Sequence, residues 1–223
     1  MTTPTTHQFT KYQKLYDYLN KKLFKKELPP CLLILSRNTA RVCGHFSMNR
    51  WQDDKGLTTH EINLNPVYMA NATNIDICQT LVHEMVHLWQ FEFGKKRSRM
   101  GYHNKEWGDK MESVGLMPSN TGKEGGKKTG QQMNDYPIKG GEFEKVFKAM
   151  PKGMLLPFKS KDFAIGFKPA NKPPKGSKPT SSAAKPYRRN KAKYACPCGT
   201  NVWGKPELKI LCGKCKGEFE EVG

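Results

Sequence analysis

The chain has 223 residues and a formal net charge of +18, from 38 Lys and Arg against 20 Asp and Glu. This length allows one sizeable domain and a smaller one. No stretch approaches the about 18 consecutive apolar residues of a membrane-spanning helix, and residues 1–9 are too polar for a secretion signal. We therefore expect a soluble intracellular protein with no membrane partner.

The first part of the chain predicts a helix followed by three short strands. Residues 9–26 carry apolar side chains three and four positions apart, and the Pro-Pro pair at residues 29–30 ends this pattern. Strands are predicted at residues 32–36, 42–48 and 61–64, where apolar residues alternate or run together. We expect these strands to form a small antiparallel sheet.

The H-E-M-V-H motif at residues 83–87 is the most informative feature of the chain. It lies in a segment, residues 73–94, that is apolar almost all round and is predicted to be a buried helix. Because His83 and His87 are four residues apart, a helix presents both imidazoles to one face, where they can bind one Zn²⁺. Glu84 lies between them and can act as general base and acid toward a water at the metal.

A buried helix with two hydrogen-bonded histidines and no metal is the simpler alternative. However, a charged Glu84 in an apolar helix is costly unless a nearby group compensates the charge. A bound cation with its water provides that compensation. We therefore favour a metal site, with hydrolysis of a peptide bond as the reaction class.

A catalytic zinc ion needs three protein ligands and one open position. His103 is the best-placed third ligand, because it follows the motif helix and a basic loop at residues 95–99. It also precedes a second helical pattern at residues 104–114. The remaining histidines are predicted to be ordinary surface or half-buried residues: His7, which lies near an end expected to fray, His45 and His60.

The chain after this second helix gives weaker signals. Residues 122–130 are rich in Gly and Lys, with no helix or strand pattern and no phosphate-loop spacing. A short helix is predicted at residues 143–150 and a strand at residues 162–167.

Four cysteines near the carboxyl end form two close pairs, Cys196 with Cys198 and Cys212 with Cys215. This arrangement matches the two metal-binding knuckles of a zinc ribbon, although the first knuckle has one intervening residue where two are usual. Two disulfides are the alternative, but seven cysteines and no signal segment favour structural zinc. A closed four-cysteine site leaves no position for substrate, so it would stabilise the fold. The other cysteines are predicted to be reduced core residues: Cys31, Cys43 and Cys78.

Positive charge is concentrated between the two groups of metal-binding residues. Residues 152–193 hold twelve Lys or Arg against one acidic residue, and residues 168–184 are rich in Pro, Lys, Gly and Ser, which predicts a flexible linker. Such a basic run is typical of nucleic-acid binding, or of a solubilising linker without a partner.

Aromatic residues beside cations at the end of this run favour DNA. Phosphate attraction combined with base stacking is the usual way of binding single strands. The alternative role for Trp203 and Phe219 is packing in the small core of the ribbon. For Phe219 we weigh this role at least as heavily as DNA binding. The predicted DNA-binding residues are Lys185, Tyr187, Arg188, Arg189, Lys191, Lys193, Tyr194 and Trp203.

Taken in order, these motifs resemble the SprT-like metalloproteases, the group that includes Spartan. The resemblance covers roughly residues 7–150 and implies zinc ligation by His83, His87 and His103, with Glu84 as general base or acid. Many members also end in a zinc ribbon, and Spartan-like members cleave proteins crosslinked to DNA. The resemblance rests on G-H-F at residues 44–46 with Trp51, H-E-I-N-L-N-P at residues 60–66, the H-E-M-V-H motif, and H-N-K-E-W at residues 103–107.

One position departs from the family pattern. The family usually has Gly directly after the third histidine, whereas this chain has Asn104. Asn tolerates left-handed backbone conformations better than most residues, so we expect the turn to be retained.

The sequence thus predicts an α+β protein with a zincin-like metalloprotease domain at residues 7–150, a flexible basic linker at residues 151–193 and a zinc ribbon at residues 194–223. We expect one catalytic and one structural Zn²⁺. The predicted function is a zinc-dependent endopeptidase that acts on DNA-associated or DNA-crosslinked proteins inside the cell. The alternatives are a DNA-binding regulatory or structural zinc protein without protease activity, and a general intracellular peptidase. Tyr102 and Tyr136 are candidates for stabilising the oxyanion.

Overall fold

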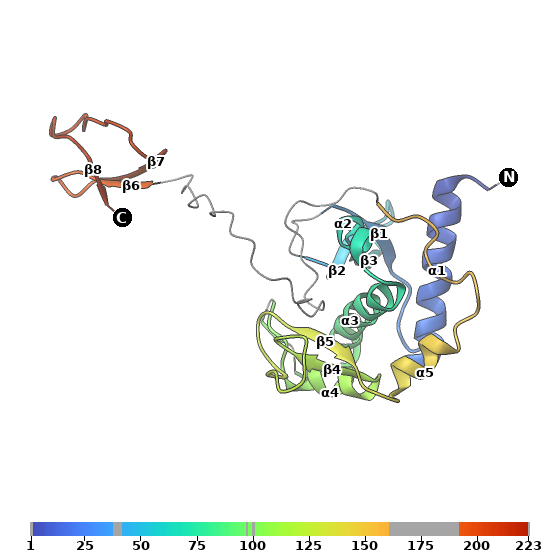
Figure 1. The fold of residues 1–223 in the computed structure, drawn as a ribbon. Helices are drawn as coiled ribbons and strands as arrows, with labels where there is room; N and C mark the ends of the chain where they lie inside the picture. Colours follow the sequence, from blue (N-terminus) through green and yellow to red (C-terminus); the bar gives the residue numbers. More distant parts are fainter. Residues whose placement is uncertain (1, 38–41, 97, 100, 161–191, 223) are drawn as a thin grey trace, which may run out of the picture. The chain divides into compact units, whose positions relative to one another are not determined.

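A computed structural model describes residues 2–37, 42–96, 98–99, 101–160 and 192–222 of the chain. It divides into two units, Met1–Pro173 and Pro174–Gly223 (Figure 1). Among the described residues, no helix is both long and apolar enough to cross a membrane. The strand predicted at residues 162–167 lies outside the described residues, as do five of the predicted DNA-binding residues: Lys185, Tyr187, Arg188, Arg189 and Lys191.

The first helix begins earlier than the sequence pattern predicts. Helix α1 (Pro4–Leu23) begins at Pro4. The first N–H groups of a helix have no acceptor within it, so proline loses no hydrogen bond at this position. Thr3 caps the helix by accepting a hydrogen bond from the Thr6 N–H. His7 therefore lies in a helix and not in a frayed end, which corrects the prediction for this residue. The apolar side of α1 packs into the core, with Leu15 and Leu19 fully buried.

The three predicted strands are present, but they form a mixed sheet. Strands β1 (Leu32–Leu35), β2 (Gly44–Gln52) and β3 (Thr58–Leu64) are arranged in the order β1-β3-β2. β2 and β3 pair antiparallel, whereas β1 pairs parallel with β3. The prediction of an antiparallel sheet was therefore wrong for β1. Alternation of apolar residues specifies that a segment is extended, but not which neighbour it pairs with. The short helix α2 (Pro66–Asn71) was not predicted.

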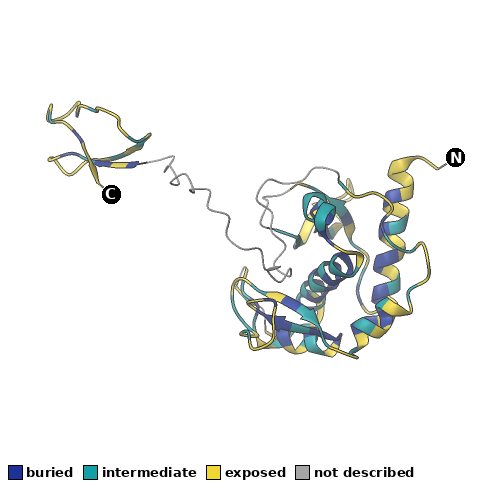
Figure 2. Cartoon of the chain, viewed as in Figure 1, coloured by how far each residue is buried: buried dark blue, intermediate teal, exposed yellow. Residues whose placement is uncertain are grey.

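The motif helix α3 (Asn74–Phe93) is confirmed, with both predicted ends. Thr73 and Asp76 form a capping box at its start, and Gly94 follows its last residue. The helix packs against β2 and β3 on one side and against α4 (Lys105–Ser113) on another. Buried residues are concentrated along it (Figure 2).

A second small sheet follows α4. Strands β4 (Leu116–Ser119) and β5 (Asn134–Pro137) pair antiparallel. Neither was predicted, because each has four residues and contains a proline, so neither shows a clear alternating pattern. Helix α5 (Glu142–Lys148) matches the predicted short helix.

The second unit is a small sheet with two loops. Strands β6 (Ala192–Ala195), β7 (Asn201–Gly204) and β8 (Glu220–Val222) form an antiparallel sheet in the order β7-β6-β8. Its buried hydrophobic residues are Ala192, Tyr194, Cys196, Cys212 and Phe219.

Candidate metal centres

Helix α3 and the segment before α4 bring three histidines together. His83 and His87 lie one turn apart on α3, and His103 precedes the first turn of α4. One ring nitrogen from each lies within 4.8 Å of the others, and the two Nε2 atoms of His87 and His103 are 3.0 Å apart. The structure thus assembles the three residues that the sequence indicates as ligands.

Hydrogen bonds made by Nδ1 of His83 and Nδ1 of His103 orient the Nε2 atoms of these two rings. Nδ1 of His83 lies 2.8 Å from the Asp135 carboxylate, and Nδ1 of His103 lies 3.2 Å from the Gly130 carbonyl oxygen. Because both partners are acceptors, each Nδ1 carries the hydrogen and donates it, which leaves Nε2 with a free lone pair. Asp135 has no sequence signal, since its partner in the fold is 52 residues away.

The donor set fits a cation such as Zn²⁺. Burial lowers the pKa of His87 well below its usual value and that of His103 to about 4, so both rings are neutral. Lone pairs of neutral imidazoles repel one another unless a proton or a cation lies between them. Three such nitrogens with one open position are the typical ligand set of catalytic zinc, with metal–nitrogen distances of about 2.0–2.1 Å.

Trp107 on α4 packs against all three imidazoles. Its ring centroid lies 4.9 Å from His83, 5.4 Å from His87 and 4.3 Å from His103. The Trp107 side chain is fully buried. Because one rigid aromatic side chain contacts the three rings, their orientations depend on the packing of α4 against α3 as well as on the hydrogen bonds.

Glu84 lies next to the histidines under the edge of β2. It is 5% exposed, and burial is the main reason that the pKa of its carboxyl is raised to about 7. A hydrogen bond from the Phe46 backbone and the nearby His83 act in the opposite direction. A cation held by the histidines would also favour the ionised carboxylate and so lower the pKa of Glu84. Gly44 allows the close approach of β2, since a Cβ there would lie 3.2 Å from Cγ of Glu84.

Asn104 occupies an ordinary extended conformation, with φ −86°. The tolerance of Asn for left-handed conformations is therefore not used here, and the turn still brings His103 to the other two histidines. Asn104 instead caps α4, accepting from the Trp107 N–H at 3.0 Å, and it also accepts from the Gln90 side chain at 2.7 Å. Asn104, which stands where the family usually has Gly, therefore caps α4 and links it to α3.

The other predicted residues of this unit lie in separate contacts. His45 pairs with Glu61 at 3.2 Å, and His60 pairs with Glu92 at 2.9 Å. A role for Tyr102 or Tyr136 at the oxyanion stays a prediction: Tyr102 contacts Arg99 by a cation–π interaction, and Tyr136 lines a cavity described below.

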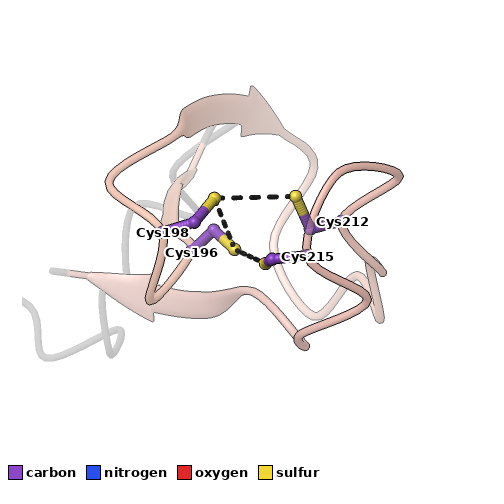
Figure 3. A group of neighbouring side chains, drawn as sticks. All are labelled: Cys196, Cys198, Cys212 and Cys215. Carbon is purple, nitrogen blue, oxygen red and sulfur yellow. Dashed lines mark hydrogen bonds between the residues drawn. The ribbon is translucent and has the colours of Figure 1, made fainter.

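The four predicted cysteines also come together (Figure 3). Their sulfur atoms lie within 4.8 Å of one another, with separations of 3.3 Å for Cys196 with Cys198 and with Cys215, and 3.7 Å for Cys198 with Cys212. These distances are far longer than the about 2.05 Å of a disulfide, and all four thiols are free. Four convergent sulfurs are compatible with a structural metal ion.

Each cysteine knuckle is shaped by backbone hydrogen bonds. The Cys196 N–H donates to the Thr200 carbonyl at 2.8 Å, and the Cys212 N–H donates to the Gly217 carbonyl at 2.8 Å. Hydrogen bonds from the Thr200 side chain and backbone lower the pKa of Cys198 to about 6, which favours the thiolate that binds metal. The short first knuckle therefore still positions both of its sulfurs.

Three predicted DNA-binding residues lie in the described part of the second unit. Lys193 and Trp203 are opposite each other on β6 and β7, and the Trp203 residue is 66% exposed. Tyr194 is only 1% exposed, and its hydroxyl donates to the Lys205 carbonyl oxygen. Its ring is part of the small core and cannot stack on a base, so the prediction for Tyr194 was wrong. Phe219 is buried in the same core.

Comparison with known proteins gives one family and one relative. The SprT-like family matches residues 12–125. An uncharacterized protein of Salmonella typhimurium, named for its position in the mucB 3′ region, is 42% identical over 60 residues, which are 26% of this chain and 80% of that protein. No solved structure matches the chain. Since the family match spans half of the sequence, the chain belongs to the SprT-like family.

Proposed function

We propose that this protein is a zinc-dependent endopeptidase that cleaves DNA-associated or DNA-crosslinked proteins. The observation that carries the proposal is the convergence of His83 and His87 from α3 and His103 from the segment before α4, beside the buried Glu84 carboxyl group. Membership of the SprT-like family supports a metallopeptidase-like role. The zincin-like core, formed by α3 and the edge of β2, is part of this proposal.

Each residue of the site has a separate task in the reaction. His83, His87 and His103 hold the metal, which when bound lowers the pKa of water and polarises a carbonyl group. Glu84 accepts a proton from the attacking water and returns it to the leaving amine. Asp135 keeps His83 in the tautomer that binds metal.

The second unit and the basic linker are proposed to bind DNA. Trp203 presents an exposed aromatic face, and the opposite residue, Lys193, adds a positive charge beside it. The linker residues from Lys185 to Lys191 add five more cations or aromatic groups in sequence: Lys185, Tyr187, Arg188, Arg189 and Lys191. Binding to the same DNA raises the effective concentration of a DNA-bound substrate at the active site.

The test compares wild type with Glu84→Gln, which keeps the shape of the side chain and removes the base. A protein crosslinked to single-stranded DNA and the same protein without DNA serve as substrates, with zinc supplied. We expect wild type to cleave the crosslinked protein faster, and the variant to be slower by about 10²–10⁴-fold. Equal rates for the two enzymes would contradict the protease function. Equal rates for the two substrates would instead support a general peptidase.

A further inference from the structure

We infer that a cavity at the start of α3, whose lining residue Gln79 lies one helical turn before His83, binds a bulky, uncharged side chain of the protein substrate, within a few residues of the peptide bond that is cut. This inference rests on the proposed endopeptidase function. The cavity has a volume of about 300 Å³ and lies between the start of α3 and the strand β5. Its walls include Ile75 and Gln79 from α3, Tyr136 and Pro137 from β5, and Lys123 from the loop between β4 and β5.

The cavity and the histidines share one side of α3. Ile75, Gln79, His83 and His87 follow one another at intervals of four residues, which places them in a row along the helix. Gln79 and His83 are separated by about 6 Å along the axis, since an α-helix rises about 1.5 Å per residue. An extended peptide advances about 3.3 Å per residue. Ile75, the lining residue of α3 farthest from His83, is about 12 Å from it along the axis. A side chain in the cavity thus belongs to a residue two to four positions from the scissile bond.

Strand β5 also has one residue that contacts a histidine and one that lines the cavity. Its residue Asp135 contacts His83 at 2.8 Å, and its next residue, Tyr136, lines the cavity. Gln79 donates a hydrogen bond to the Asp135 carbonyl oxygen at 2.8 Å, which joins the two walls of the cavity. A substrate side chain in the cavity would therefore lie against the same strand that orients a metal ligand.

The chemistry of the walls favours an uncharged occupant. The Gln79 amide is used by its bond to β5. Asp76, which also lines the cavity, accepts hydrogen bonds from the N–H and hydroxyl of Thr73 at 2.9 and 2.7 Å. The remaining lining residues of the helix and strand are Ile75, Tyr136 and Pro137. A charged side chain would meet a group of its own sign in either case, because Asp76 and Lys123 line the same cavity with opposite charges.

The volume sets the size of the occupant. A cavity of about 150 Å³ lined by apolar side chains is sufficient to hold benzene. About 300 Å³ therefore accommodates a side chain such as Phe, Leu or Met. The loop wall is preformed, because the Ser119 hydroxyl donates to the Lys123 carbonyl at 2.6 Å and accepts from the Lys123 N–H at 3.2 Å.

Cleavage-site profiling tests the inference directly. Zinc-loaded wild type with single-stranded DNA is incubated with a library of peptides from denatured proteins, and the cut sites are read by mass spectrometry. We expect Phe, Leu or Met to exceed Ala by about 10-fold at one position within about four residues of the cut. In Ile75→Trp, which fills the cavity, the preference at this position should change to Ala or Gly. A conservative replacement on α1, Phe9→Trp, serves as the matched control and should keep the wild-type preference.

A binding measurement keeps the test independent of cleavage. Zinc-loaded Glu84→Gln is titrated by NMR with capped pentapeptides of alanine whose central residue is Phe, Leu, Ala or Glu. We expect the Phe and Leu peptides to bind about 10-fold more tightly than the other two and to shift the signals of Gln79 and Tyr136. Introducing Ile75→Trp should remove the difference, and the amide spectrum of that variant reports whether it is folded.

The two measurements separate the possible failures. Equal binding of all four peptides, or an unchanged cut-site preference in an active, folded Ile75→Trp protein, would overturn the inference. Selective binding without any cleavage by wild type would contradict the endopeptidase function and leave the cavity as a peptide-binding site.

Discussion

The two groups of metal-binding residues are built in opposite ways. The histidines lie in a unit whose described residues include 26 buried hydrophobic core residues, and their ring orientations are set by Trp107, Asp135 and Gly130. The cysteines lie in a unit whose described residues include five buried hydrophobic residues, and two of these are the candidate ligands Cys196 and Cys212. In the first unit the apolar core fixes the positions of the histidines. In the second unit we expect a metal ion bound by the cysteines to stabilise the fold. Metal binding should therefore matter for chemistry in one unit and for folding in the other.

Removal of metal should separate the two units most clearly. A strong chelator should unfold residues 192–222, because binding zinc supplies on the order of 10 kcal/mol to such small folds. The first unit should keep its tertiary structure, since its large apolar core does not depend on the ion. NMR amide spectra recorded before and after chelation measure this, with added zinc as the test of reversal. Simultaneous unfolding of both units would contradict the comparison.

Counting reactive thiols gives an independent check on the same samples. Burial raises the pKa of Cys31, Cys43 and Cys78 to about 12, so these thiols stay protonated at pH 8. Cys78 is also buried, whereas Cys31 and Cys43 are half-buried. The ribbon thiols lose their protection when the metal leaves, and Cys198, with a pKa lowered to about 6, is then a thiolate. Alkylation at pH 8 followed by mass spectrometry should modify four cysteines after chelation and none before it. Modification of the buried Cys78 without denaturant would contradict its place in the core.

Replacing Asp135 by Asn should weaken the histidine site without unfolding it. The amide keeps the size of the side chain but loses the charge that holds the proton on Nδ1 of His83. Loss of such a partner typically lowers metal affinity by 10–100-fold. Competition with a chelator of known affinity measures the change. Asp109→Asn on α4 is the matched control, since Asp109 forms an exposed ion pair with Lys105. Equal affinities for the two variants would show that Asp135 does not support the site.

Most of the site residues that could be predicted from the sequence have a partner one short loop or one helical turn away in the chain. His83 and His87 are one helical turn apart, and the capping box of Thr73 and Asp76 spans three residues. Short spacing makes the geometry a property of the helix alone. The cysteine knuckles were predictable for the same reason, because each is formed by a short loop.

The features that were missed depend on contacts between distant segments. Asp135 reaches His83 because β5 lies beside α3, and β1 pairs with the edge of β3 opposite to the one that β2 occupies. Tyr194 and Trp203 are both aromatic residues of one small sheet, and the side of the sheet on which each lies decides its role. An alternating pattern of four residues is too short to show which side is buried.

Gly44→Ala should disturb the contact between β2 and α3. The added methyl group would lie 2.9 Å from the Asn63 carbonyl oxygen and 3.2 Å from Cγ of Glu84. Overpacking of this kind costs about 1–3 kcal/mol. The gain of about 0.4–1 kcal/mol from a less flexible unfolded chain is smaller, so we expect a net loss of stability. Urea unfolding of the zinc-loaded protein measures it, and an unchanged midpoint would contradict the close approach of β2 to Glu84.

Trp203→Ala should give the smallest effect and should act on DNA binding alone. Loss of one stacked base costs about 1–3 kcal/mol. We expect a loss at the lower end of this range, about fivefold in affinity for single-stranded DNA. The reason is that Trp203 is 66% exposed, so part of its surface is already covered by the protein. Titration with a fluorescent oligonucleotide at fixed salt measures the change. Tyr194→Phe is the contrasting variant, since it removes a buried hydroxyl that donates to Lys205. It should lower ribbon stability and leave affinity unchanged in the folded, zinc-loaded protein. The opposite pattern, with Tyr194 affecting affinity and Trp203 affecting only stability, would reverse the roles assigned to the two faces of this sheet.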